Sequence, residues 1–224
     1  MQKLFFFFFM AFLLTGCGFS SHQSESDAPQ TPTFNTNKNK KTIVAMGDSL
    51  TEGLNIPQEK NYPSQLEIKL QQEGYEHYKV ANAGIPGETT SSAANRLDWV
   101  LRLEPDLVLL ATGGNDALRG IDPEITQTNI EKMIRFFQEQ EIPILLIGIQ
   151  APNNQGSEYT KAFNQIYSTL AEKYETPFMP LFWEGLEQTP EYFQADGIHP
   201  TSKGYTVMVD NLWSYLQPLL ESKT

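Results

Sequence analysis

One serine and one histidine carry the first chemical signal in this chain of 224 residues. Ser49 ends the sequence Gly-Asp-Ser directly after an apolar run, and His199 stands three residues after Asp196. The other two histidines, His22 in a polar tail and His77 before an apolar run, are poorer candidates for a base. A hydroxyl becomes a nucleophile when a base removes its proton, and a carboxylate can orient that base. The three residues therefore predict a serine nucleophile with its histidine base and an orienting aspartate.

These residues need elements that bring them together, and the apolar pattern supplies those elements. Short continuous apolar runs bounded by stretches with helical spacing are typical of parallel strands buried on both faces. The pattern predicts an α/β fold: a flavodoxin-like three-layer α/β/α sandwich with a five-stranded parallel sheet. The expected strands are residues 42–46, 79–83, 107–111, 144–149 and 178–181, and helical spacing marks residues 62–70, 94–103, 130–137, 163–170 and 203–219.

Two further loops follow expected strands and should lie on the same sheet edge as Ser49, since the carboxyl ends of parallel strands share one edge. They are residues 82–90 and 112–116. Together with the segments around Ser49 and His199, they resemble the four blocks of the SGNH, or GDSL, hydrolases, in order. The resemblance spans residues 41–219 and rests on Gly47-Asp48-Ser49-Leu50, Gly84, Gly113-x-Asn115-Asp116 and Asp196-x-x-His199.

Membership of this family implies the SGNH hydrolase fold, a serine esterase activity and no cofactor. The resemblance assigns an oxyanion hole to the backbone N–H groups of Ser49 and Gly84 and to the side-chain amide of Asn115. Within the family, the similarity is greatest to the bacterial type described as thioesterase I, protease I and lysophospholipase, and to related arylesterases. Residues 113–120 and 196–200 carry that similarity.

Other chemistries fit the sequence less well. A phosphate-binding first loop for a flavin should carry little negative charge, but Asp48 and Glu52 stand in this one. No third or fourth ligand accompanies Asp196 and His199 at a spacing suited to a metal, so no metal is expected. The chain lacks the Gly-x-Ser-x-Gly sequence of ordinary α/β-hydrolases. Asp48 and Asp116 are interpreted as structural carboxylates that cap neighbouring N–H groups.

Apolar residues on two loops that converge on Ser49 are interpreted as an apolar rim for a small-molecule substrate with a fatty acyl or aryl group. The alternative is that they merely cover the end of the sheet. The function favoured is hydrolysis of carboxylic esters or thioesters, with a carbohydrate or peptidoglycan O-acetylesterase or an idle binding lipoprotein as alternatives. The proposed substrate-binding residues are Leu118, Ile121, Phe182, Trp183, Tyr192 and Phe193, with Leu186 beside them.

The amino-terminal segment predicts an exported lipoprotein. Residues 4–14 form an apolar run too short to span a bilayer as a helix, and Leu-Thr-Gly-Cys (14–17) resembles a lipobox. An ordinary signal peptide with a chance cysteine is the alternative. We expect residues 1–16 to be the signal peptide, residues 17–41 to be a lipidated Cys17 with a disordered tether, and residues 42–224 to be the hydrolase domain. The mature protein would be membrane-anchored, facing the periplasm, with the outer membrane favoured, or on the cell surface.

Composition limits the partners of this domain. The formal charge of −11 argues against nucleic acid as an electrostatic partner. Cys17 is the only cysteine, so no disulfide within the chain can stabilise the fold. The predicted domain is long enough for one well-buried core, and a monomer is expected.

Overall fold

The computed structural model describes residues 40–221, all within a compact unit that runs from Asn37 to Thr224. The predicted signal peptide, the lipidation of Cys17 and the tether up to residue 39 lie outside the described residues. Between residues 40 and 221, no helix combines the length and the apolarity that crossing a membrane requires.

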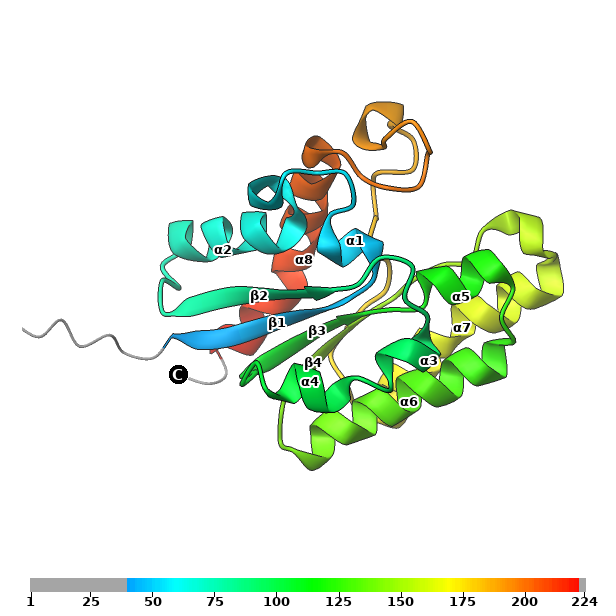
Figure 1. The fold of residues 1–224 in the computed structure, drawn as a ribbon, viewed down its shortest axis with the longest axis horizontal. Helices are drawn as coiled ribbons and strands as arrows, with labels where there is room; N and C mark the ends of the chain where they lie inside the picture. Colours follow the sequence, from blue (N-terminus) through cyan, green and yellow to red (C-terminus); the bar gives the residue numbers. More distant parts are fainter. Residues whose placement is uncertain (1–39, 222–224) are drawn as a thin grey trace, which may run out of the picture. The chain divides into compact units, whose positions relative to one another are not determined.

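A five-stranded parallel sheet forms the middle layer, in the order β2-β1-β3-β4-β5 (Figure 1). The expected α/β architecture is confirmed. Strand β1 begins one residue earlier than the predicted domain boundary, and β4 and β5 each end two residues earlier than expected. The strands are β1 (Lys41–Gly47), β2 (Tyr78–Gly84), β3 (Leu107–Ala111), β4 (Ile144–Ile147) and β5 (Phe178–Met179).

Helices cover both faces of this sheet. Helices α2 and α8 contact each other on one face, and α6 and α7 contact each other on the opposite face (Figure 1). Their buried apolar side chains meet the strands, and those of β3 and β4 are buried throughout, as continuous apolar runs require. The long helices are α2 (Tyr62–Gln72), α6 (Pro123–Glu139), α7 (Ser157–Lys173) and α8 (Ser202–Glu221).

The helix expected over residues 94–103 is wrong as a single element. Within that range the α-helix is limited to α4 (Leu97–Leu101), and a separate short helix, α3 (Thr90–Ala93), lies before it. The break falls at Arg96, whose φ of −115° and ψ of 18° are not helical. Its guanidinium instead binds the Glu88 carboxylate and a carbonyl of β2. Helix α4 therefore begins only after Arg96, whose side chain is held by these contacts.

Short elements at the carboxyl edge of the sheet complete the fold. Helix α1 (Ser49–Glu52) follows β1, and helix α5 (Gly114–Arg119) follows β3. Three single-turn 3₁₀ segments lie in other loops: η1 (Gln58–Lys60), η2 (Asn153–Gln155) and η3 (Pro190–Tyr192). The two short helices give the loops after β1 and β3 fixed backbone geometry.

Candidate active site

Ser49 is the first residue of helix α1, at the point where strand β1 ends. The Asp48 side chain caps this helix, because its Oδ1 accepts a hydrogen bond of 3.0 Å from the Leu50 N–H. The turn is tight: a Cβ at Gly47 would lie 2.1 Å from Thr51 Oγ1 and 2.5 Å from the Ala111 carbonyl oxygen. A residue without a side chain is therefore required at position 47, and the serine is held at the sheet edge.

The structure brings His199 and Asp196 to this serine. His199 Nε2 lies 2.9 Å from Ser49 Oγ, and His199 Nδ1 lies 2.7 Å from Asp196 Oδ2. Asp196 Oδ1 also accepts hydrogen bonds of 2.9 Å from the N–H groups of Ile198 and His199. Gly197, with φ at +68°, makes the turn that lets the two side chains meet. The three residues form a continuous hydrogen-bonded chain.

The charge on Asp196 is stabilised by these donors. The His199 and Ile198 N–H groups, followed by the His199 ring, lower the pKa of Asp196 from 3.8 to about 2. The carboxylate is therefore ionised over the whole neutral range. An ionised partner at Nδ1 favours the tautomer in which Nε2 is free to accept a proton from the serine.

Gln194 anchors the histidine loop, and the sequence analysis did not identify it. Its Nε2 donates hydrogen bonds of 2.8 Å to the Leu54 carbonyl and 3.0 Å to the Pro200 carbonyl. Its backbone N–H donates to the His199 carbonyl at 2.7 Å. One glutamine thus links both ends of the histidine loop to the segment after α1. The only sign of this role in the sequence was that a polar residue stands two positions before Asp196.

Asn115 lies in the first turn of α5 and faces the serine loop. Its Nδ2 donates to Asp48 Oδ2 at 3.4 Å. Asp48 is only 2 % exposed, and burial raises its pKa to about 6, although the Leu50 N–H and His199 act in the opposite direction. The structural interpretation of Asp48 fits these contacts, because its two oxygens connect the serine helix to Asn115.

Asp116, the other carboxylate of this region, is fully buried. It accepts hydrogen bonds from the Thr90 N–H at 2.8 Å, from the Thr90 hydroxyl at 2.5 Å and from the Thr126 hydroxyl at 3.2 Å. These donors come from α3 and α6. Asp116 therefore ties the loop after β2 to the helix after Asn115, as its structural interpretation implies.

The assignment of Gly84 to an oxyanion hole needs correction. The Gly84 N–H already donates to Asn82 Oδ1 at 2.9 Å, and a Cβ at Gly84 would lie 2.2 Å from the Glu52 nitrogen. Gly84 therefore allows β2 to approach α1, and its N–H is engaged within the loop. This contact could not be read from the glycine alone, since it depends on the Asn82 side chain.

The same loop contains one glycine, Gly87, whose N–H differs from those of its neighbours. The Ile85 N–H donates to the Gly47 carbonyl and the Glu88 N–H to the Ile85 carbonyl, while Pro86 has no N–H. Over residues 84–88, Gly87 is thus the position whose N–H has no acceptor among the described residues. Its carbonyl accepts a 2.9 Å hydrogen bond from Arg119 of α5. Gly87 is held beside the helix that carries Asn115.

The predicted apolar rim is only partly present. Phe182 is wrong as a substrate contact because it is 0 % exposed and packs edge-on against Tyr62, with ring centroids 5.1 Å apart. Leu186 is buried as well. The remaining residues of the predicted rim divide between one exposed leucine, Leu118, and four partly buried side chains, Ile121, Trp183, Tyr192 and Phe193.

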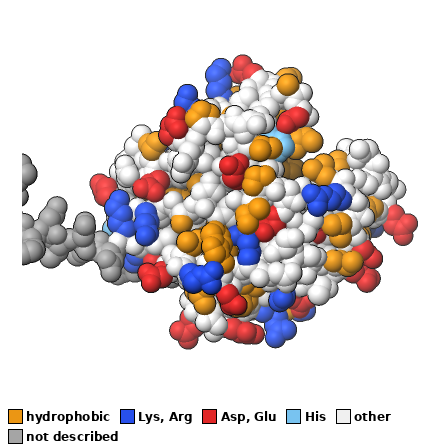
Figure 2. Space-filling view, in the orientation of Figure 1, with side chains coloured by type: hydrophobic (Ala, Val, Ile, Leu, Met, Phe, Trp, Pro, Cys, Tyr) orange, Lys and Arg blue, Asp and Glu red, His pale blue; other side chains and the backbone are white. Residues whose placement is uncertain are grey.

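Two exposed isoleucines beside site residues were missed. Ile85 follows Gly84, and Ile198 precedes His199. Figure 2 shows hydrophobic side chains gathered beside a histidine on the face in view, while charged side chains of both signs are scattered over the rest. Ile85 and Ile198 are therefore exposed apolar side chains in the same loops as the motif residues, as Leu118 is on α5, and their positions next to motif residues were the available signal.

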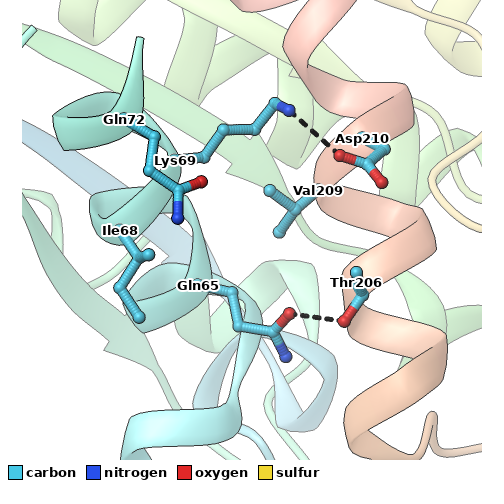
Figure 3. A pocket seen from close by; sticks show the side chains of 7 residues that line it. All are labelled: Gln65, Ile68, Lys69, Gln72, Thr206, Val209 and Asp210. Atoms are coloured by element: carbon cyan, nitrogen blue, oxygen red, sulfur yellow. Dashed lines mark hydrogen bonds and ion pairs between the residues drawn. The ribbon is translucent and has the colours of Figure 1, made fainter. Parts of the chain in front are cut away.

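A surface hollow elsewhere on the domain contains none of the three hydrogen-bonded residues. It lies between α2 and α8, where Lys69 binds Asp210 at 3.0 Å and Thr206 donates to Gln65 at 2.8 Å (Figure 3). Among residues 40–221, no three His, Cys, Asp or Glu side chains gather in a way that could hold a metal ion.

Comparison with known proteins agrees with this geometry. Residues 45–207 match the GDSL-like Lipase/Acylhydrolase family. The chain is 37 % identical to Esterase TesA of Pseudomonas aeruginosa over 80 % of this chain and 89 % of that protein. It is 33 % identical to Thioesterase 1/protease 1/lysophospholipase L1 of Escherichia coli K12, over 80 % and 85 % respectively.

A solved structure shows the same relationship in three dimensions. The crystal structure of TesA superposes with a TM-score of 0.76 at 36 % identity, over 80 % of this chain and 99 % of that one. The family match covers most of the chain and includes every residue of the hydrogen-bonded chain at Ser49. The protein belongs to the GDSL-like lipase/acylhydrolase family, the SGNH esterases.

Proposed function

We propose that this protein hydrolyses carboxylic esters and thioesters through an acyl-enzyme on Ser49. The observation that carries the proposal is the hydrogen-bonded chain from Ser49 Oγ through the His199 ring to Asp196. His199 Nε2 takes the serine proton as Oγ attacks the acyl carbonyl, and Asp196 holds the ring and stabilises its positive form. His199 then returns the proton to the leaving alcohol or thiol. Water then attacks the acyl-enzyme: His199 takes the proton from the water and passes it to Ser49 Oγ, and the acid is released.

The negative oxygen of the tetrahedral intermediate requires fixed donors. The Ser49 N–H stands at the start of α1, and Asn115 Nδ2 keeps one hydrogen free while the other points to Asp48. The Gly87 N–H supplies the third donor in place of that of Gly84. Its carbonyl is held by Arg119, one turn after Asn115 on α5, which supports a common orientation of the two loops.

Acyl or aryl esters are the substrate class that the surroundings favour. Exposed Ile85, Leu118 and Ile198 lie on the three segments that carry Gly87, Asn115 and His199, and apolar side chains there suit a hydrocarbon group. The names of the relatives support the same class, since they include an esterase, a thioesterase and lysophospholipase, and an arylesterase of Vibrio mimicus at 37 % identity.

Lipidation of Cys17 is a separate proposal that rests on the sequence Leu-Thr-Gly-Cys. Acyl chains on this cysteine would tether the enzyme to a membrane on the exported side, with the outer membrane favoured. Lysophospholipids and other esters would then be closer at hand than cytoplasmic acyl-CoA. Metabolic labelling with palmitate, compared between the natural chain and Cys17→Ala, tests this proposal.

The hydrolase proposal is tested with the full-length chain in detergent on p-nitrophenyl esters from acetate to palmitate. Ser49→Ala should abolish the activity, whereas Ser168→Ala, at an exposed serine of α7, should leave it unchanged. Rates that rise from acetate towards longer chains would support a lipid esterase. Activity confined to acetate would identify an O-acetylesterase, and wild-type activity equal to that of Ser49→Ala would overturn the proposal in favour of a binding protein.

A further inference from the structure

Arg96 has no role in the chemistry described above, yet its side chain is 12 % exposed and strongly bound. Its Nε and Nη2 form a two-pronged ion pair with the Glu88 carboxylate, at 2.7 and 2.6 Å, and the Glu88 side chain is 4 % exposed. A buried pair of this kind is costly to desolvate and strongly destabilising to break. Such a pair in the loop after β2, next to Gly87, therefore needs a physical explanation.

The other contacts of the guanidinium supply that reason. Arg96 Nη2 donates to the Ala83 carbonyl at 2.8 Å and to the Gly47 carbonyl at 3.3 Å. Gly47 lies two residues before Ser49 at the end of β1, Ala83 lies near the end of β2, and Glu88 directly follows Gly87. One planar group therefore binds a carbonyl at the end of β1, a carbonyl near the end of β2 and the side chain of the residue that follows Gly87.

We propose that Arg96 is a positioning residue: its guanidinium fixes the loop that carries the Gly87 N–H against the end of β1, two residues before Ser49. The inference rests on the proposed function, because the two N–H groups matter only if an oxyanion forms between them. This positioning depends on the forked shape of the Arg96 guanidinium. Lysine would keep the positive charge but has a single nitrogen, which cannot bind both Glu88 oxygens and the strand carbonyls together.

Three variants of the full-length chain in detergent separate positioning from simple stability. Arg96→Lys keeps the charge, and the double variant Arg96→Met/Glu88→Leu removes the pair without leaving a buried charge unpaired. Arg135→Lys is the matched control, since Arg135 makes an exposed ion pair of 3.6 Å with Glu139 on α6. The end point of labelling with a fluorophosphonate counts the competent serines, so that kcat is expressed per labelled Ser49.

We expect kcat per labelled serine to fall about 30-fold to 100-fold in Arg96→Lys and in the double variant, because small misplacements at a reacting centre have effects of this order. KM should stay within about threefold, and the affinity for an alkylboronic acid, which forms a tetrahedral adduct on the serine, should fall together with kcat/KM. Arg135→Lys should match the wild type. Recovery of thermal stability in the double variant without recovery of kcat would separate positioning from folding.

The inference is overturned if both Arg96 variants keep a wild-type kcat per labelled serine, or if kcat falls while the boronic acid binds as tightly as before. The first result would assign Arg96 to stability alone. The proposed function fails by a different result, namely wild-type hydrolysis that does not depend on Ser49.

Discussion

Asp48 and Asp196 are far apart in the sequence and both belong to the site around Ser49, but their surroundings differ sharply. Asp48 precedes Ser49 at the end of β1 and is 2 % exposed, with a pKa raised to about 6. The Asp196 side chain lies in the loop before α8, is 41 % exposed and has a pKa lowered to about 2. The pKa values of two aspartates on the same sheet edge are therefore shifted in opposite directions.

The difference follows from the balance between burial and hydrogen-bond donors. Asp196 receives two backbone N–H groups and the His199 ring while it remains in contact with water. Asp48 receives one backbone N–H and a longer contact from Asn115, and burial outweighs both. The exposed aspartate suits a permanent charge beside His199. The buried one suits the connection of two loops, at a cost to stability when it ionises.

The largest loss of activity is expected when the negative charge of Asp196 is removed. Asp196→Asn should lower kcat about 10⁴-fold, since an amide favours the wrong histidine tautomer and no longer stabilises the positive ring. Steady-state kinetics on a p-nitrophenyl ester would measure the loss. Asp98→Asn, at an exposed site on α4, provides the control. A value within tenfold of the wild type would contradict the role given to Asp196.

A smaller loss is expected at the contact between Asn115 and Asp48. Asn115→Asp removes an oxyanion donor and places a second carboxylate against Asp48, where the amide now lies 3.4 Å away. Loss of one donor typically lowers kcat by about 10²-fold to 10³-fold. Asn95→Asp, an exposed position before Arg96, adds the same charge outside the contact. Activity of Asn115→Asp within tenfold of the wild type would remove Asn115 from the oxyanion hole.

The parts of this fold that were predicted correctly are those with a continuous local signal. Strands β3 and β4 are buried on both faces, so their apolar runs identify them directly. Helices α1 and α5 were missed because four and six residues are too short for a periodic pattern. Ser49, Asp196 and His199 belong to short sequence motifs, so they could be identified from the sequence alone.

The failures arise where the contacts of a particular side chain decide the outcome. Asn82 determines that the Gly84 N–H is engaged, so two glycines of one loop could not be told apart from the sequence. Tyr62, on α2, buries the ring of Phe182, although both neighbours of Phe182 in the chain are less buried. Propensity and spacing contain no information on such side-chain contacts.

The stability of the protein should also depend on pH differently at the two aspartates. The folded pKa of Asp48, about 6, lies above its ordinary value of 3.8, so the unfolded chain ionises first as pH rises. Wild type should therefore lose stability between about pH 4 and 6. Asp48→Asn avoids this loss and still caps α1, since asparagine is an equally good capping residue. The variant should be more stable at pH 8, by at most about 3 kcal/mol, and close to wild type at pH 4.

Asp196 should show the opposite sign in the same experiment. Its folded pKa of about 2 lies below 3.8, so its contribution is complete above about pH 4 and is lost as pH falls towards 2. Urea unfolding of wild type, Asp48→Asn and Asp196→Asn from pH 2 to 8 gives two difference curves. The Asp48 difference should change between pH 4 and 6, and the Asp196 difference, smaller because the group is exposed, should change below pH 4. Asp210→Asn, in the exposed pair with Lys69, controls for loss of a surface charge. Parallel difference curves would mean that burial does not distinguish the two carboxylates.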